Sequence, residues 1–212
     1  ERGMVPPGEF LPQVEQHRVS IDIGNWVLET AISQMETWQA RGLSAGISVN
    51  INAVHLLEPN FVPSLRRHLR NHPEVNPANL ELEILESTAI NDIDRAARVI
   101  KACRKLGVSV SLDDFGTGFA ALEYLKRLPA DTLKIDQTFV RGMDEDDKGN
   151  MAIIKGIIGL ARAFNFDVIA EGVETTDQGA TLIELGCLHG QGFGIARPMP
   201  ADKFESWQQT WE

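Results

Sequence analysis

Residues 108–118, with the sequence VSVSLDDFGTG, join a short apolar strand to an abrupt polar ending. Apolar residues alternate with serine up to Leu112, which predicts a β-strand because side chains alternate between the two faces of a strand. Asp113 and Asp114 follow at once, and a turn with two glycines comes next. This strand with an acidic end is the element from which the rest of the chain can be interpreted.

The same alternation of strand and helix extends in both directions from this segment. Further strands are predicted over residues 46–50, 80–84, 132–135, 167–170 and 187–191. Helices are predicted over residues 21–40, 91–106, 61–71, 120–128, 148–164 and 176–185 and after Pro200, with Ser20 as the N-cap of the first. No hairpin signal interrupts the pattern, so an α/β fold with a parallel sheet is expected.

The number of strand–helix units indicates a TIM-like (β/α)8 barrel of which this chain contains only a part. About six units are present, whereas a closed barrel needs eight. The first eight residues have a loop-like composition. We therefore expect the N-terminal strand or strands of the barrel to be missing from this chain, and residues 1–212 to form one incomplete domain.

Composition restricts the possible functions. The chain has 212 residues, of which 43% are hydrophobic, and a formal net charge of −10. An acidic surface argues against binding to a nucleic-acid polymer or an anionic membrane. The two cysteines form neither a ligand cluster nor a disulfide framework, which favours a reducing, cytoplasmic location, although the parent protein could be anchored in a membrane.

Each predicted strand presents a polar residue at or near its carboxyl end. A single acidic residue there is most simply a helix cap or a loop charge, but a repeated series calls for another explanation. In a parallel barrel all these ends meet at one mouth, where such folds hold their active sites. The residues in question are Asn50, Glu83, Asp113, Asp114, Lys134, Glu171 and Gln191.

This set of residues predicts a site for divalent cations. Clustered carboxylates repel one another unless cations are bound. Oxygen ligands without histidine or cysteine favour Mg²⁺ or Mn²⁺ over Zn²⁺. Two ions about 3.5–4 Å apart form the usual clamp for attack on a phosphodiester, and Lys134 would then orient the attacking water or neutralise phosphate charge.

Six segments together resemble the EAL-domain family, in the order and spacing of that family. They are residues 48–50 (SVN), 82–87 (LEILES), 113–118 (DDFGTG), 133–136 (LKID), 170–175 (AEGVET) and 191–193 (QGF). The resemblance implies a TIM-like barrel with an atypical antiparallel first strand. It also implies hydrolysis of cyclic di-GMP to linear pGpG with two Mg²⁺ or Mn²⁺ ions.

The resemblance implies a role for each matching residue. Asn50, Glu83 and Asp113 correspond to ligands of the first metal, and Asp113, Asp114 and Glu171 to ligands of the second. Lys134 and Glu171 correspond to the groups that position or activate the hydrolytic water, and Gln191 to a glutamine beside metal-bound waters. Glu86 corresponds to a glutamate that supports the loop after the acidic pair, which includes Gly116, Thr117 and Gly118. Phe193 and Pro198 correspond to nucleotide contacts. The alternative for Glu86 is a surface glutamate, and for the loop a simple strand-to-helix turn.

The family's Glu-Ala-Leu segment is absent from this chain and is expected just upstream of Glu1. That segment carries one further metal-ligand carboxylate. A catalytically inactive cyclic di-GMP receptor therefore stays open as the alternative to a phosphodiesterase, and a structural interaction domain is a third, weaker interpretation. The family also implies a homodimer and an attached sensory or regulatory domain.

The histidines receive no catalytic role. His68 and His72 lie four residues apart beside several arginines, which favours a solvated helix face. His55 and His189 lie near predicted strand ends, where packing is favoured over contact with a ligand.

Overall fold

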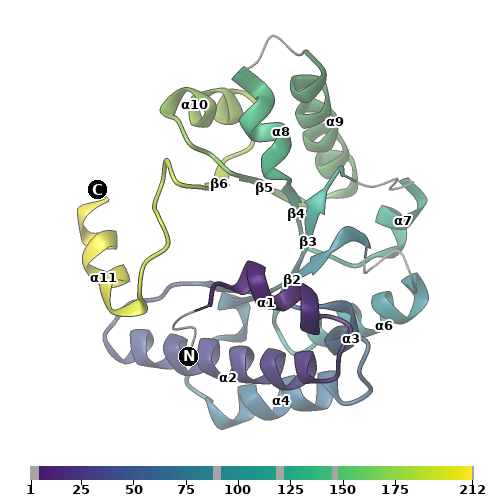
Figure 1. Ribbon diagram of the computed structural model, residues 1–212, viewed down its shortest axis with the longest axis vertical. Coiled ribbons are helices and arrows are strands. Elements are labelled where there is room, and N and C mark those ends of the chain that lie inside the picture. Colours follow the sequence, from purple (N-terminus) through teal and green to yellow (C-terminus); the bar gives the residue numbers. More distant parts are fainter. Residues whose placement is uncertain (1–4, 88–91, 118–121, 145–147, 212) are drawn as a thin grey trace. The chain divides into compact units, whose positions relative to one another are not determined.

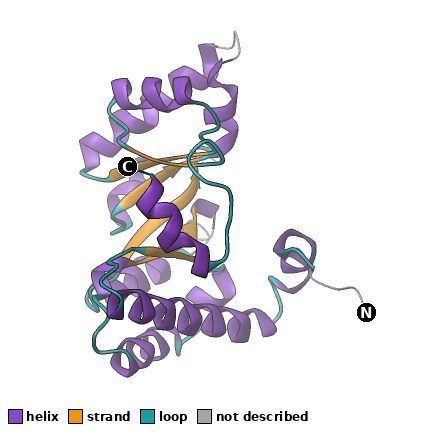
Figure 2. Ribbon diagram, turned by 90° about the vertical axis from the view of Figure 1, so that its left-hand side faces the viewer, coloured by secondary structure: helices purple, strands orange, loops and turns teal. Residues whose placement is uncertain are grey.

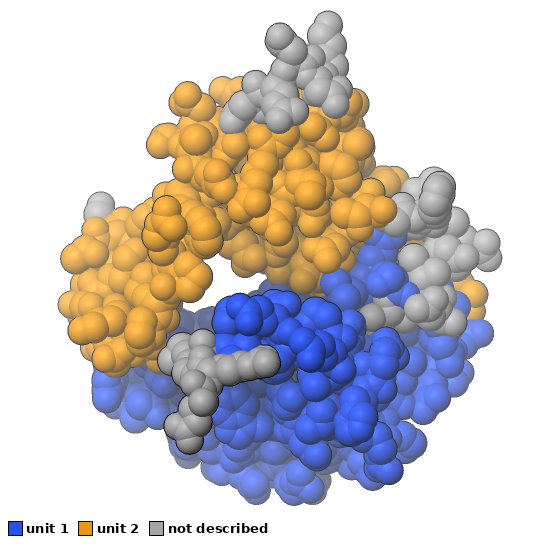
Figure 3. All heavy atoms as spheres, in the orientation of Figure 1, with its two compact units in different colours: residues 1–109 blue, residues 110–212 orange. Residues whose placement is uncertain are grey.

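The computed structural model describes residues 5–87, 92–117, 122–144 and 148–211. It divides into two compact units, residues 1–109 and 110–212, which are coloured separately in Figure 3. Strands alternate with helices along the chain in both units (Figures 1 and 2).

Unit 1 is mostly helical and contains one pair of parallel strands. Its elements are α1 (Pro7–Val14), α2 (Val19–Ala40), β1 (Ile47–Asn50), α3 (Ala53–Leu56), α4 (Phe61–Asn71), η1 (Pro77–Asn79), β2 (Leu80–Leu85) and α6 (Ile93–Arg104). The strands β1 and β2 pair from Ile47 opposite Leu80 to Asn50 opposite Glu83. Helices α2 and α4 lie side by side (Figure 1).

Unit 2 carries the remaining parallel strands. Its elements are β3 (Ser109–Phe115), α7 (Leu122–Arg127), β4 (Thr132–Ile135), α8 (Gln137–Arg141), η2 (Gly142–Asp144), α9 (Lys148–Phe164), β5 (Asp167–Glu171), α10 (Thr176–Leu185), β6 (His189–Gln191) and α11 (Ala201–Thr210). Strand β3 pairs with β4, β4 with β5 and β5 with β6, all parallel. Strand β4 has a neighbouring strand on each side, and all four of its residues are buried.

Most predicted elements are confirmed within one to three residues. The helices α4, α9 and α10 begin and end as the sequence pattern predicts, because apolar residues recur every three or four positions along them. In α2 the same spacing buries Leu28, Ile32 and Met35. The strands pair in parallel, as expected from the alternation of strand and helix.

Three short helices and one cap differ from the predictions. Helix α1 includes Pro7 and Gly8 of the predicted N-terminal loop, and Pro7 stands in its first turn, where a missing N–H costs nothing. Helices α3 and α8 are too short to give a periodic signal. The expected N-cap Ser20 is wrong, because α2 begins at Val19 and Ser20 is buried inside its first turn.

No helix among residues 5–87, 92–117, 122–144 and 148–211 combines the length and the apolar character that a membrane span requires.

The solvated face predicted for His68 and His72 is also wrong. His68 in α4 and His72, which directly follows α4, face two glutamates of α2, so His68 is 7% exposed. His68 Nδ1 contacts Glu29 Oε2, while His72 Nδ1 lies 2.9 Å from Glu36 Oε2 and His72 Nε2 lies 3.3 Å from Glu29 Oε1. The hydrogen bond to Glu36 raises the pKa of His72, and the hydrogen bond to His68 lowers the pKa of Glu29.

These shifts predict a stability contribution that depends on pH. The part due to His72 is complete below its unfolded pKa of about 6.5 and is lost as pH rises through its higher folded pKa. The part due to Glu29 is lost instead as pH falls through its lowered folded pKa. The effect is small, because the side chains of Glu29 and Glu36 are 43% and 40% exposed and water screens the pairs.

Replacement of His72 by glutamine therefore lowers the free energy of unfolding by about 0.5–1 kcal/mol at about pH 6, and by less at about pH 9. Urea denaturation at the two pH values measures this difference. Arg66→Gln, on the exposed side of the same helix, is the control and shows no such pH dependence. An equal loss at both pH values for His72→Gln would contradict the ion-pair explanation.

Candidate metal centre

Four neighbouring strands of unit 2 bring polar side chains to their carboxyl ends. Asp113 and Asp114 lie near the end of β3, Lys134 lies in β4, and Glu171 and Gln191 end β5 and β6. Glu171 and Gln191 are direct register partners. Because parallel strands end on the same edge of a sheet, this order gathers residues that are up to 78 positions apart in sequence (191 − 113).

The acidic pair occupies an irregularity in the pairing of β3 with β4. Leu112 pairs with Leu133 and Phe115 pairs with Ile135, so two residues of β3 stand opposite the single residue Lys134. Asp114 also has a positive φ of 54°. In a regular strand two adjacent side chains point to opposite faces, whereas a bulge redirects one of them.

The bulge has a direct chemical consequence. Asp113, Asp114 and Glu171 each offer one carboxylate oxygen, and these three atoms all lie within 4.8 Å of one another. Asp113 is 8% exposed, so this negative charge gathers in a largely buried place. Three carboxylates in such proximity are unfavourable without compensating positive charge.

Lys134 supplies part of that charge. Its side chain is 2% exposed, and Nζ lies 3.1 Å from Asp113 Oδ1 and 2.5 Å from Glu171 Oε1. Gln191 Nε2 donates a hydrogen bond of 2.6 Å to the same oxygen of Glu171. One ammonium group therefore holds carboxylates from two different strands in fixed positions, and the amide of Gln191 orients the second of them.

Asp136 is a member of the cluster to which the sequence analysis assigns no role. It follows β4 directly, is 6% exposed, and accepts a hydrogen bond of 2.9 Å from the backbone N–H of Thr138 as the N-cap of α8. Burial, the charge of Asp113 and a hydrogen bond with Asp136 raise the pKa of Asp114 to about 6. Burial also acts on Asp136, but the hydrogen bonds from Thr138 outweigh it and lower the pKa of Asp136.

The donor set fits a hard divalent cation. Apart from the ammonium group of Lys134 and the amide N–H of Gln191, the converging groups present oxygen: they are the carboxylates of Asp113, Asp114 and Glu171. Mg²⁺ and Mn²⁺ prefer such ligands. Positive charge at this position would relieve the repulsion that Lys134 offsets only in part.

The loop after the acidic pair begins with a tight turn. Thr117 Oγ1 donates a hydrogen bond of 2.9 Å to the carbonyl of Asp114. Gly116 has a φ of +99°, and a Cβ at this position would lie 3.0 Å from Ile157 Cδ1 and 3.1 Å from Phe139 Cε2. Both its conformation and its surroundings therefore require glycine. Gly118, the last loop residue of the predicted set, lies outside the described residues.

Three of the predicted residues, Asn50, Glu83 and Glu86, belong to unit 1. Asn50 and Glu83 are register partners at the ends of β1 and β2, so their backbones lie side by side. Glu83 is 6% exposed and Glu86 is 5% exposed, which excludes the alternative of a surface glutamate for Glu86. Whether Asn50 and Glu83 act on the same ions as the carboxylates of unit 2, and whether Glu86 supports the loop, stay predictions.

The two predicted nucleotide contacts lie on exposed parts of unit 2. Phe193 is 51% exposed, and the guanidinium carbon of Arg197 lies 4.9 Å from its ring centroid. Pro198 is also exposed and follows Arg197 directly. The ring is therefore accessible on the surface, and its contact with a nucleotide stays a prediction.

The family model for the EAL domain matches residues 1–198, and the chain belongs to this family. It is 41% identical over 204 residues to the bifunctional diguanylate cyclase/cyclic di-GMP phosphodiesterase MucR of Pseudomonas aeruginosa, covering 96% of this chain and 30% of MucR. It is 35% identical over 212 residues to the cyclic di-GMP phosphodiesterase PdeR of Escherichia coli, covering 100% of this chain and 32% of PdeR.

Solved structures confirm the predicted fold class. The MucR phosphodiesterase in complex with c-di-GMP matches with a TM-score of 0.90 and 41% identity, over 96% of this chain and 82% of that one. The FimX EAL domain of Pseudomonas aeruginosa bound to c-di-GMP matches with a TM-score of 0.82 and 25% identity, over 92% and 77% of the two chains. The α/β fold with parallel strands is thus that of the TIM-like EAL domains.

Gly116 provides a test of the loop geometry. Gly116→Ala lowers the free energy of unfolding by about 1–2 kcal/mol, because alanine is strained at positive φ and its Cβ crowds Ile157 and Phe139. Urea denaturation at neutral pH measures the change.

The matched control is Gly156→Ala in α9, where a Cβ meets no atom within 4 Å. Alanine favours the helix, so this variant raises the free energy of unfolding by about 0.5–1 kcal/mol. If both variants changed stability in the same direction, the inferred constraint at Gly116 would be wrong.

Proposed function

We propose that this chain is the catalytic region of a metal-dependent phosphodiesterase that hydrolyses cyclic di-GMP to linear pGpG. The observation that carries the proposal is the buried Lys134, which binds Asp113 and Glu171 beside a third carboxylate, Asp114. Membership of the EAL family and the substrate named for MucR and PdeR support the choice of cyclic di-GMP.

The proposal assigns two divalent cations, Mg²⁺ or Mn²⁺, to this centre. Asp113, Asp114 and Glu171 would hold one ion through their clustered oxygens. Family resemblance assigns the other ion to Asn50, Glu83 and Asp113, with Gln191 acting through a water molecule. When bound, such ions neutralise phosphate charge and lower the pKa of a water molecule.

The side chains of Lys134, Glu171 and Gln191 are assigned the positioning of the water and the transfer of its proton. Lys134 Nζ lies 2.5 Å from Glu171 Oε1, and the proposal assigns to these two groups the positioning of one water molecule for in-line attack on the phosphodiester. The water oxygen forms a bond to phosphorus while Glu171 accepts a proton from the water. The bond from phosphorus to the 3′-oxygen breaks, and this oxygen keeps the electron pair and takes a proton from solvent. Gln191 orients Glu171 for this step through its hydrogen bond of 2.6 Å.

The alternative, a receptor that binds cyclic di-GMP without turnover, requires fewer of these groups. A binding site has no need of a buried lysine between two carboxylates, which makes the enzyme the better explanation. We also propose that the protein acts as a homodimer with an attached sensory or regulatory domain, in the cytoplasm, where its buried cysteines stay reduced.

The test is hydrolysis of cyclic di-GMP by the full-length protein that contains this chain, with Mg²⁺ or Mn²⁺, followed by chromatography of the product. Glu171→Gln keeps the shape of the side chain but removes its charge and basicity. We expect kcat to fall by about 10²–10⁴-fold, the usual contribution of an acid–base group, while binding of cyclic di-GMP is retained.

Glu184→Gln is the matched control, since Glu184 is exposed on α10 and is none of the residues assigned to the centre. It leaves kcat unchanged within about twofold. Binding without formation of pGpG by the unmodified protein would favour the receptor, and full activity of Glu171→Gln would remove this residue from the mechanism.

A further inference from the structure

Helices α4 and α6 of unit 1 carry a concentration of basic residues that the phosphodiesterase proposal does not use. Residues 61–71 and 93–105 contain eight of the chain's 20 lysine and arginine residues, but only one of its 30 acidic residues, Asp94. The two helices contact each other. The net charge of −10, which argues against an anionic partner, therefore describes the chain as a whole and not these two neighbouring helices.

Five exposed members of this group form a surface that we name the basic face. They are Arg66, Arg70, Arg98, Lys101 and Lys105. Residues three or four positions apart lie on the same side of a helix, and the opposite sides of α4 and α6 are buried in the protein. The basic face therefore projects from two neighbouring helices into solvent.

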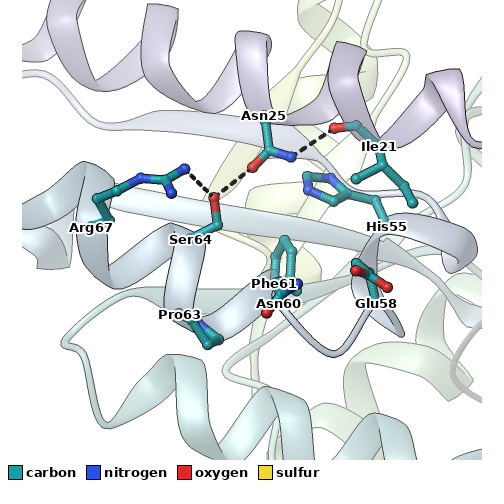
Figure 4. A pocket seen from close by; sticks show the side chains of 9 residues that line it. All are labelled: Ile21, Asn25, His55, Glu58, Asn60, Phe61, Pro63, Ser64 and Arg67. Carbon is teal, nitrogen blue, oxygen red and sulfur yellow. Dashed lines mark hydrogen bonds between the residues drawn. The ribbon is translucent and has the colours of Figure 1, made fainter.

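The basic face differs from two nearby arginines that bond within the protein. Arg67 Nη2 donates a hydrogen bond of 3.0 Å to Ser64 Oγ, at the wall of a pocket among α2, α3 and α4 (Figure 4). Arg95 Nη2 donates a hydrogen bond to the carbonyl of Leu57. Within the described parts of the chain, neither a hydrogen bond nor an ion pair is recorded for the five side chains of the basic face. Their N–H groups are thus available to an external partner.

Like charges lie next to each other along both helices of the basic face. Arg66 and Arg70 are four residues apart, and so are Lys101 and Lys105. Pairs of this kind destabilise a helix, and solvated helix faces more often combine both signs of charge. The unbalanced charge is therefore a cost to the folded chain, and an anionic partner would remove this cost.

The basic face has no apolar centre. Among the residues that the structure describes, the exposed large hydrophobic side chains all lie outside residues 61–105. Stable protein–protein interfaces have an apolar or aromatic centre, and single-stranded nucleic acids stack their bases on aromatic side chains. The composition of the basic face therefore disfavours both an acidic protein and a single strand as the partner.

The arrangement of the helices favours an extended anionic surface over a nucleic-acid duplex. A recognition helix protrudes from its domain and enters a groove of the duplex. By contrast, α4 and α6 are in contact with each other and present their charges side by side. Anionic lipid headgroups form an extended surface that strengthens binding by about fivefold for each nearby lysine or arginine.

We propose that the basic face binds the surface of a membrane that contains anionic phospholipids. The guanidinium and ammonium groups contact the lipid phosphates and carboxylates, and no side chain inserts into the hydrocarbon, because the face has no exposed large apolar residue among those described. The proposal does not rest on the proposed hydrolysis of cyclic di-GMP, so either can fail alone.

Cosedimentation of the protein with lipid vesicles tests the proposal. We expect saturable binding to vesicles with about 30% phosphatidylserine in phosphatidylcholine, and at least about tenfold weaker binding to phosphatidylcholine alone. An increase in ionic strength from about 0.1 M to about 1 M shortens the Debye length from about 10 Å to about 3 Å. Binding to the anionic vesicles is then lost, because the attraction is electrostatic.

Two sets of substitutions locate the site on the basic face. Arg70→Gln, Arg98→Gln and Lys101→Gln together remove three contributions of about fivefold each and weaken binding by about 100-fold. Arg66→Gln and Lys105→Gln together weaken it by about 25-fold. Thermal unfolding verifies that each variant is folded, and if one set failed to fold, the other set would still decide.

The matched control replaces three exposed lysines of unit 2 by glutamine: Lys126, Lys155 and Lys203. It changes the net charge by the same amount as the first set, but it changes vesicle binding by less than about threefold. A control that weakened binding as much as the first set would show that only net charge matters, and would overturn the proposal.

Two further results would overturn the proposal. One is the absence of binding to the phosphatidylserine vesicles at an ionic strength of about 0.1 M. The other is displacement of the protein from these vesicles by a short DNA or RNA duplex at a phosphate concentration below that of the anionic lipid, since the basic face would then be a nucleic-acid site.

Discussion

The repulsion between carboxylates at the ends of β3 and β5 is the constraint on which the rest of unit 2 depends. Three acidic oxygens lie within 4.8 Å of one another, and folding can bring them together only against an electrostatic cost. Lys134 offsets part of this cost from within the sheet, because it is buried and contacts Asp113 and Glu171 at once. Three clustered carboxylates exceed the single positive charge of Lys134, so a divalent cation would stabilise this cluster further.

Parallel pairing and one local irregularity produce this arrangement. Register places Glu171 beside Gln191, and the bulge opposite Lys134 lets two adjacent aspartates serve one centre. The turn at Gly116 follows immediately, so the backbone leaves the sheet where the acidic pair ends. The hydrogen bonds of Asp136 with Thr138 fix the start of α8 beside the same cluster.

Much of this could be predicted from sequence, because period-two strands and polar strand ends are local signals. Asp113, Lys134, Glu171 and Gln191 were selected in this way, and contacts join these four side chains. The bulge could not be predicted, since strand alternation alone sends Asp113 and Asp114 to opposite faces. His68 and His72 were misassigned because their partners, Glu29 and Glu36, lie on another helix, more than thirty residues away. Such pairings depend on how the two helices pack against each other, which a local sequence pattern does not predict.

The central claim is that the clustered carboxylates bind divalent cations. Anomalous diffraction from crystals of the protein grown with Mn²⁺ tests it most directly. The account predicts a manganese peak within about 2–2.5 Å of carboxylate oxygens of Asp113, Asp114 and Glu171, the range expected for a hard cation with oxygen ligands. At saturating Mn²⁺, the absence of a peak among these three side chains would contradict it.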